Sequence, residues 1–183
     1  MRKTIVALLA LAFSAGAALA TGGVGVFGSY LDSEDLGPGF GGGIKFKADL
    51  AEFFAVDFRA SCLTQFDEWE GDDDLFVIPL EAGLLLTLPL GDEVPVTLYG
   101  GGGGGYAIIP EADDIDFDDS FCFYGIGGIE LGLGEGASLF AEAQYRILEV
   151  DGFEVDGDEF DFDDGDEGEL SGLGLNAGLL FRF

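Results

Sequence analysis

The chain has 183 residues, with 36 acidic residues against seven basic ones and no histidine. A net charge of −29 leaves no basic surface for nucleic acid, and 48% hydrophobic residues exclude a disordered acidic segment. Without histidine, Ser-His triads, Cys-His dyads and His-ligated metals are excluded, so no enzyme is expected. A hydrolase that uses only carboxylates stays possible, but among so many acids no pair stands out.

The first twenty residues have the three parts of a secretory signal peptide. A basic Arg-Lys pair precedes an apolar run, Ile5 to Phe13, and a small-x-small cleavage site, Ala18-Leu19-Ala20. A transmembrane anchor is the alternative, but the run is short and ends in small residues. We expect residues 1–20 to be the signal peptide and residues 21–183 to form one domain with a net charge of −31. No later stretch is long and apolar enough for a membrane-spanning helix.

After Thr21, stretches with alternating apolar and polar residues are separated by short polar connections, the pattern of β-strands. Eight such stretches are about ten residues or longer, which is the length that crosses a bilayer at the tilt of a barrel. They are residues 22–31, 39–50, 53–64, 75–88, 94–109, 121–133, 137–150 and 170–183. The predicted fold is all-β: an eight-stranded antiparallel up-and-down transmembrane β-barrel.

The predicted connections alternate in length, as periplasmic turns and external loops do in transmembrane barrels. The four longer ones, residues 32–38, 66–74, 110–120 and 151–169, hold 26 of the 36 acidic residues, so the charge is expected on one external rim. Asp-x-Asp spacings in the last loop are typical of Ca²⁺ ligands, but no window matches an EF-hand loop. A solvated anionic loop, or adaptation to high salt, is the alternative to weak binding of divalent cations.

The basic residues of the predicted strands fall on the parity opposite the apolar stripe. In the second strand, for example, Ile44, Phe46 and Ala48 are expected to face lipid. Eight strands enclose a space that their side chains just fill, and charges there must be paired. The pattern predicts a lumen plugged by ion pairs, with solvated charges on a soluble sandwich as the alternative. The predicted network is Lys45, Lys47, Asp49, Asp57, Arg59, Glu81, Glu130, Glu142, Arg146 and Arg182.

Two other features have no assigned chemistry. The run Gly100 to Gly105 lacks the Lys-Ser/Thr ending of a phosphate-binding loop, and we expect it to bend the fifth strand or to admit bulky neighbours such as Tyr99 and Tyr106. Cys62 and Cys122 lie near the external ends of their strands. Opposite parity argues against a disulfide between them, although a bulge at the rim could bring them together.

The last stretch reads LSGLGLNAGLLFRF and ends on an aromatic residue. It resembles the C-terminal strand of bacterial outer-membrane β-barrels. With the signal peptide and the eight strands, the mature chain resembles the small OmpA/OmpX-type, porin-like family over essentially its whole length. The resemblance implies a location in the bacterial outer membrane, contact with its lipid, and recognition by the barrel-assembly machinery through Leu179, Phe181 and Phe183.

These signals specify fold and location rather than activity. The expected function is a structural or surface-interaction barrel with acidic external loops and a charge-plugged lumen. The alternative is a small passive channel for ions or small solutes. A monomer without a cofactor is expected, and its partners at the acidic loops are either cations or an extracellular surface.

Overall fold

The computed structural model describes residues 22–33, 37–64, 76–91, 95–108, 115–117, 120–150, 152–155, 158–161, 168–169 and 171–183. The stretch predicted as a signal peptide lies outside these residues. None of these residues belongs to a helix that is long and apolar enough to cross a membrane.

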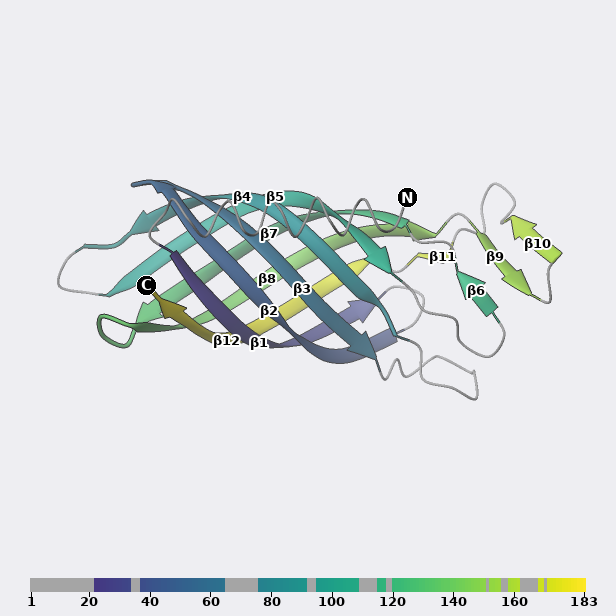
Figure 1. The fold of residues 1–183 in the computed structure, drawn as a ribbon, viewed down its shortest axis with the longest axis horizontal. Coiled ribbons are helices and arrows are strands. Elements are labelled where there is room, and N and C mark those ends of the chain that lie inside the picture. The colour runs from purple at the N-terminus through teal and green to yellow at the C-terminus, as the bar shows by residue number, and fades with distance from the viewer. Residues whose placement is uncertain are drawn as a thin grey trace.

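Eight long strands form one closed antiparallel barrel (Figure 1). Each pairs with its neighbours in chain order, and the last pairs with the first. The prediction of an eight-stranded antiparallel barrel is therefore confirmed, and every predicted strand overlaps one of the observed strands. These are β1 (Gly22–Ser33), β2 (Gly37–Ala51), β3 (Phe54–Thr64), β4 (Ile78–Pro89), β5 (Val96–Ile108), β7 (Ser120–Gly132), β8 (Ala137–Val150) and β12 (Gly172–Arg182).

The barrel closes between β1 and β12. Their register pairs Gly23 with Arg182 at one end and Ser33 with Gly172 at the other. Beyond the last pair, the backbone N–H of Phe183 donates to the Gly22 carbonyl at 3.1 Å, and the N–H of Gly22 donates to the Phe183 carbonyl at 3.4 Å. None of the eight long strands is therefore left with an open edge.

Side chains alternate between the lumen and the outer surface along each strand. In β8, for example, Leu139 is 44% exposed on the outside, whereas Glu142 is 4% exposed and points inward. Every barrel strand contributes large apolar residues to the outside, as a bilayer requires. One from each strand is Val26, Phe54, Ile44, Leu84, Leu98, Ile129, Leu139 and Leu175.

The outer face of β2 departs from the sequence prediction. Ile44 is 52% exposed, but Phe46 and Ala48, which share its parity, are only 2% and 3% exposed. The Phe183 ring stacks near Phe46 at a centroid distance of 6.3 Å. The register keeps Phe46 in the outward row, opposite Val24, as the alternation predicts. Its burial and that of Ala48 were not predicted, because alternation sets the direction of a side chain but not what covers it.

The connections gather at two ends of the barrel. At one end, which we call the short-turn end, lie the tight connections, such as residues 134–136 with Gly134 at a φ of 128°. The opposite, long-loop end carries the connections from β3 to β4, from β5 to β7 and from β8 to β12. The connection from β1 to β2 spans only residues 34–36, because Asp32 pairs with Pro38 inside the sheet. The prediction of a longer loop over residues 32–38 is therefore wrong.

The two longest connections contain short strands. These are β6 (Ile115–Phe117), β9 (Gly152–Val155), β10 (Asp158–Asp161) and β11 (Gly168–Glu169). Strand β9 pairs with β10 and β6 in a three-stranded sheet beyond the long-loop end (Figure 1). Strand β11 pairs with the last residues of β8. The interpretation of residues 110–120 and 151–169 as plain loops is therefore incomplete, since both contain apolar residues at every second position that allow strand pairing.

Candidate functional site

The middle of the lumen holds two cations and two carboxylates, which we call the central cluster: Lys45 on β2, Asp57 and Arg59 on β3, and Glu142 on β8. Lys45 Nζ lies 2.9 Å from Glu142 Oε2 and 3.8 Å from Asp57 Oδ2. Arg59 Nη1 lies 2.7 Å from Glu142 Oε1, and its Nη2 contacts Asp57. None of the four side chains is more than 3% exposed. The formal charges of this buried cluster cancel.

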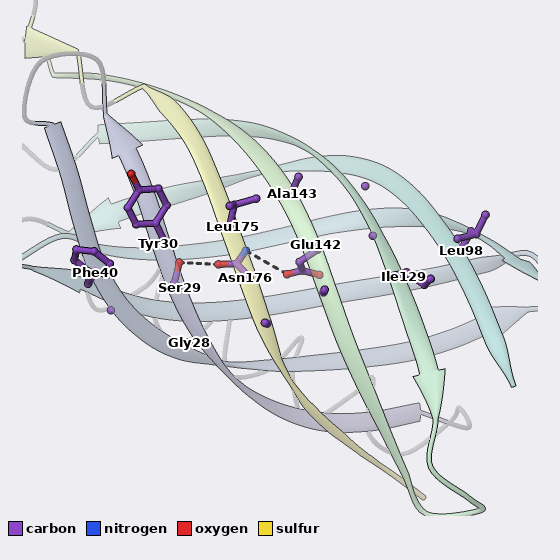
Figure 2. Close-up of a pocket in the computed structure, with 15 residues that line it drawn as sticks. Gly28, Ser29, Tyr30, Phe40, Leu98, Ile129, Glu142, Ala143, Leu175 and Asn176 are labelled. Atoms are coloured by element: carbon purple, nitrogen blue, oxygen red, sulfur yellow. Dashed lines mark hydrogen bonds between the residues drawn. The ribbon is translucent and has the colours of Figure 1, made fainter.

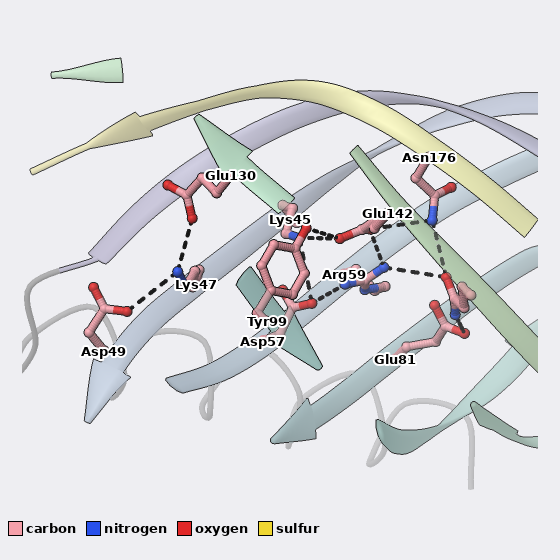
Figure 3. Close-up of polar contacts among 11 residues, drawn as sticks. Lys45, Lys47, Asp49, Asp57, Arg59, Glu81, Tyr99, Glu130, Glu142 and Asn176 are labelled. Carbon is pink, nitrogen blue, oxygen red and sulfur yellow. Dashed lines mark hydrogen bonds and ion pairs between the residues drawn. The ribbon is translucent and has the colours of Figure 1, made fainter. Parts of the chain in front are cut away.

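Glu142 makes the most contacts in the central cluster (Figure 3). Besides the two cations, it accepts hydrogen bonds from the Tyr99 hydroxyl at 2.7 Å and from Asn176 Nδ2 at 3.3 Å. Its donors therefore come from β2, β3, β5 and β12, on different sides of the ring of strands. One carboxylate from β8 thus links four other strands across the lumen.

A second pair of charges lies toward the long-loop end. Arg146 Nε is 3.0 Å from Glu81 Oε1, and Gln144 Nε2 donates to the same oxygen at 2.8 Å. Gln144 also accepts a hydrogen bond from Arg59 Nη1 at 3.3 Å, so this pair is joined to the central cluster. Glu81 and Arg146 are 1% and 5% exposed.

A third group of charges lies toward the short-turn end, where the lumen opens. Lys47 Nζ is 3.0 Å from Glu130 Oε2 and 3.7 Å from Asp49 Oδ1. Arg182 contacts Glu130 and donates from Nε to Ser138 Oγ at 3.0 Å. Because the side chains of Asp49 and Arg182 are 39% and 41% exposed, this group is the wet edge of the network.

The structure brings each of the ten charged residues named from the sequence within reach of an opposite charge, eight of them in the buried interior. Sequence reasoning missed the neutral members Tyr99, Asn176 and Ser29. Asn176 has the inward parity of the last strand, so its place in the lumen could have been predicted from the sequence. Tyr99 precedes a run of glycines, where no alternation can be read.

Glycines make room for the aromatic side chains of the lumen. A Cβ on Gly128 would lie 2.6 Å from Tyr99 Cζ, and one on Gly83 would strike the Tyr124 hydroxyl. Within the glycine run, a Cβ on Gly101 or Gly103 would collide with backbone carbonyls of β4. The run therefore permits a close approach of β4 and β5, while the room for Tyr99 comes from β7.

Other candidate chemistry is limited. Cys62 and Cys122 are free thiols, and Cys122 is fully buried. Across the part of the chain that the structure describes, no three His, Cys, Asp or Glu residues are grouped so as to hold a metal ion. The short-turn end has a polar cavity of about 410 Å³, lined by Lys47, Asp49, Glu52, Thr87, Thr97 and Arg182 among others.

Comparisons with known proteins agree with this geometry. The family model of the outer membrane protein beta-barrel domain matches residues 4–183. No curated protein sequence matches the chain. Among solved structures, OprG from Pseudomonas aeruginosa is similar at 14% identity and a TM-score of 0.67, covering 90% of this chain and 97% of that one.

Two more solved structures are similar. Neisserial surface protein A has 13% identity and a TM-score of 0.66, covering 88% of this chain and 97% of its own. The attachment invasion locus protein Ail of Yersinia pestis has 14% identity and a TM-score of 0.53, covering 90% and 99%. At such identities the likeness concerns the fold alone.

Proposed function

This chain belongs to the outer membrane protein β-barrel family, and from that starting point we propose that it is a structural and surface-interaction barrel with a closed lumen. In this proposal the protein sits in the bacterial outer membrane in contact with its lipid, ion pairs block the interior, and the long-loop end faces the cell exterior. A small passive channel is the second candidate.

The observation that carries the proposal is the set of contacts around Glu142. Hydrogen bonds from Lys45, Arg59, Tyr99 and Asn176 converge on its two oxygens from four strands. Both oxygens of Glu142 are thus occupied by donors of the protein itself and are not free to replace the hydration shell of a passing ion.

Aromatic rings support closure of the same cross-section. The Lys45 ammonium lies 4.4 Å from the centroid of the Phe140 ring and 5.5 Å from that of Tyr99. The Arg59 guanidinium lies 5.6 Å from the centroid of the Tyr124 ring. Cation–π contacts of this kind hold the long side chains across the lumen rather than along its wall.

The polar cavity at the short-turn end favours the channel as second candidate. With about 410 Å³ and exposed Asp49 and Arg182, it admits water or a small solute to the lower edge of the network. The two candidates therefore differ in whether the path continues past the central cluster.

Conductance across a planar lipid bilayer decides between them. We expect the wild-type barrel to show no steady openings. The double variant Arg59→Ala/Glu142→Ala removes one cation and one anion, keeps the net charge, and should conduct in discrete steps. Arg182→Ala at the exposed mouth is the matched control and should stay closed. Steady openings of the wild-type protein would support the channel instead.

The acidic connections suggest the chemistry of a surface partner. The Ail structure has also been solved in complex with the heparin analogue sucrose octasulfate, a polyanion. The connections of this chain over residues 66–74, 110–120 and 151–169 are rich in Asp and Glu, and they would repel such a ligand. We therefore propose that any partner at the long-loop end is cationic, either divalent cations or a basic surface.

A further inference from the structure

A shallow apolar groove of about 880 Å³ crosses the outer surface of the barrel (Figure 2). Its floor consists of small residues, with Gly28 on β1, Ala177 on β12, and Ala141 and Ala143 on β8. The register places Gly28, Ala177 and Ala141 side by side in one row. An added Cβ on Gly28 would have no heavy atom within 4 Å, which shows that the floor is open to the outside.

Large side chains border this floor on both sides. Tyr30 and Leu175 are register neighbours on the side toward the long-loop end, and Phe40 pairs with Tyr30 next to them. Val26, Leu179 and Leu139 are register neighbours in the next outward row on the side toward the short-turn end. The row of the floor itself ends on Ile129, which pairs with Ala141, and on Leu98, which pairs with Ile129. The floor is therefore a channel one side chain deep between two apolar walls.

The groove is oblique to the barrel axis. At one end Tyr30 lies three residues from Ser33, the last residue of β1 at the long-loop end. At the other end Leu98 lies two residues from Val96, the first residue of β5 at the short-turn end. The groove thus runs between the two ends of the barrel, and hence across the thickness of the bilayer rather than around one level.

Hydrogen bonds on the inner side hold this part of the wall in place. The Ser29 hydroxyl donates to Asn176 Oδ1 at 2.6 Å, and Asn176 Nδ2 donates to Glu142 Oε1 at 3.3 Å (Figure 2). These residues alternate with the floor residues along β1, β12 and β8. The groove is therefore preformed, which lowers the entropic cost of binding a flexible occupant.

We propose that the groove holds one acyl chain of a membrane lipid and retains it longer than the other lipids around the barrel. The groove is continuous with the lipid-contacting surface, so its occupant must be apolar. A narrow furrow that crosses the bilayer obliquely matches the shape and direction of an acyl chain. Tyr30, with a polar hydroxyl on an apolar ring, suits the end of the groove nearest a lipid headgroup.

The test is native mass spectrometry of the purified barrel after incubation with palmitoyl-oleoyl-phosphatidylethanolamine. Ala141→Leu fills the floor, and Ala82→Leu makes the same change on the outer face of β4 as the matched control. Leu175→Ala lowers one wall without any clash, and Leu84→Ala is its control on β4. Heat-modifiable gel migration establishes that each variant is folded.

We expect the wild-type protein and both controls to keep a bound lipid as detergent is stripped, and Ala141→Leu and Leu175→Ala to lose it. Equal retention by all five proteins would overturn the proposal. A dimer of the wild-type protein that only the two groove variants abolish would overturn it too, because the groove would then hold a second copy of the chain. If Ala141→Leu fails to fold, Leu175→Ala against Leu84→Ala decides.

Discussion

Replacement of Arg59 by methionine tests whether the central cluster is truly dry. The variant keeps a long side chain but removes a charge that is 1% exposed and contacts both Asp57 and Glu142. Glu142 would keep Lys45 among its donors. Of the described cations, Asp57 would keep only Lys45 at 3.8 Å, and its Oδ1 already lacks a hydrogen-bond partner among the described residues. The variant therefore leaves a carboxylate buried with little compensation.

Breaking a buried ion pair from one side costs about 3–5 kcal/mol of unfolding free energy. With an m-value of about 2 kcal/mol/M in urea, a loss of about 4 kcal/mol lowers the unfolding midpoint by about 2 M. The assay is urea unfolding of the barrel refolded into phospholipid vesicles, with the folded fraction read from heat-modifiable gel migration.

Two controls separate burial of charge from loss of packing. Arg182→Met removes a cation whose side chain is 41% exposed, and it should cost less than about 1 kcal/mol. The double variant Arg59→Met/Asp57→Asn removes both charges and should regain most of the lost stability, which a double-mutant cycle measures. If Arg59→Met unfolds at the same urea concentration as the wild-type protein, the reasoning is refuted and water reaches the central cluster.

Three other predictions concern assembly, topology and the acidic rim. Deletion of Phe183 should reduce insertion into the outer membrane, measured by surface labelling in cells, and normal insertion would show that the terminal residue is dispensable. Protease applied to intact cells should cut within residues 151–169 and spare residues 134–136; cleavage at residues 134–136 instead would invert the topology. The connections over residues 66–74, 110–120 and 151–169 are rich in acidic residues, and like charges so close in the sequence repel one another. Millimolar Ca²⁺ or Mg²⁺ should therefore raise the melting temperature more than monovalent salt of equal ionic strength, whereas a dependence on ionic strength alone would exclude bridging.

The strands could be predicted from the sequence because every strand of a membrane barrel has one face toward lipid and one toward the lumen. Apolar and polar residues therefore alternate along each strand. In β8, Leu139 and Ala141 alternate with Ser138 and Glu142, so the inner and outer faces can be read without any structure. The inward direction of Lys45 and Arg59 followed from the same rule. An eight-stranded ring, in turn, is narrow enough that inward charges must meet.

Which residues meet could not be read from the sequence. Three partners of Glu142 (Lys45, Arg59 and Tyr99) lie on strands that are not sheet neighbours of β8, so these contacts depend on the curvature and diameter of the ring rather than on local pattern. Tyr99 was missed because the glycines after it have no side chains to reveal a parity. The short strands β6 and β9 were missed because the number of acids in both connections concealed a few apolar residues at every second position.

The backbone hydrogen bonds between Gly22 and Phe183 have a consequence for the order of the strands. A short peptide could join these two residues while the chain is opened within residues 134–136, giving a circular permutant with every barrel pairing preserved and with β7 as its last strand. In such a permutant Phe183 still closes the barrel beside Gly22 but no longer ends the chain. The permutant therefore separates the structural contact of Phe183 from its expected role as a C-terminal assembly signal. If the permutant folds in detergent but is not inserted by cells, the assembly machinery recognises Phe183 only at the end of a chain. If cells insert the permutant as well, recognition depends on the barrel strands and does not require Phe183 at the end of the chain.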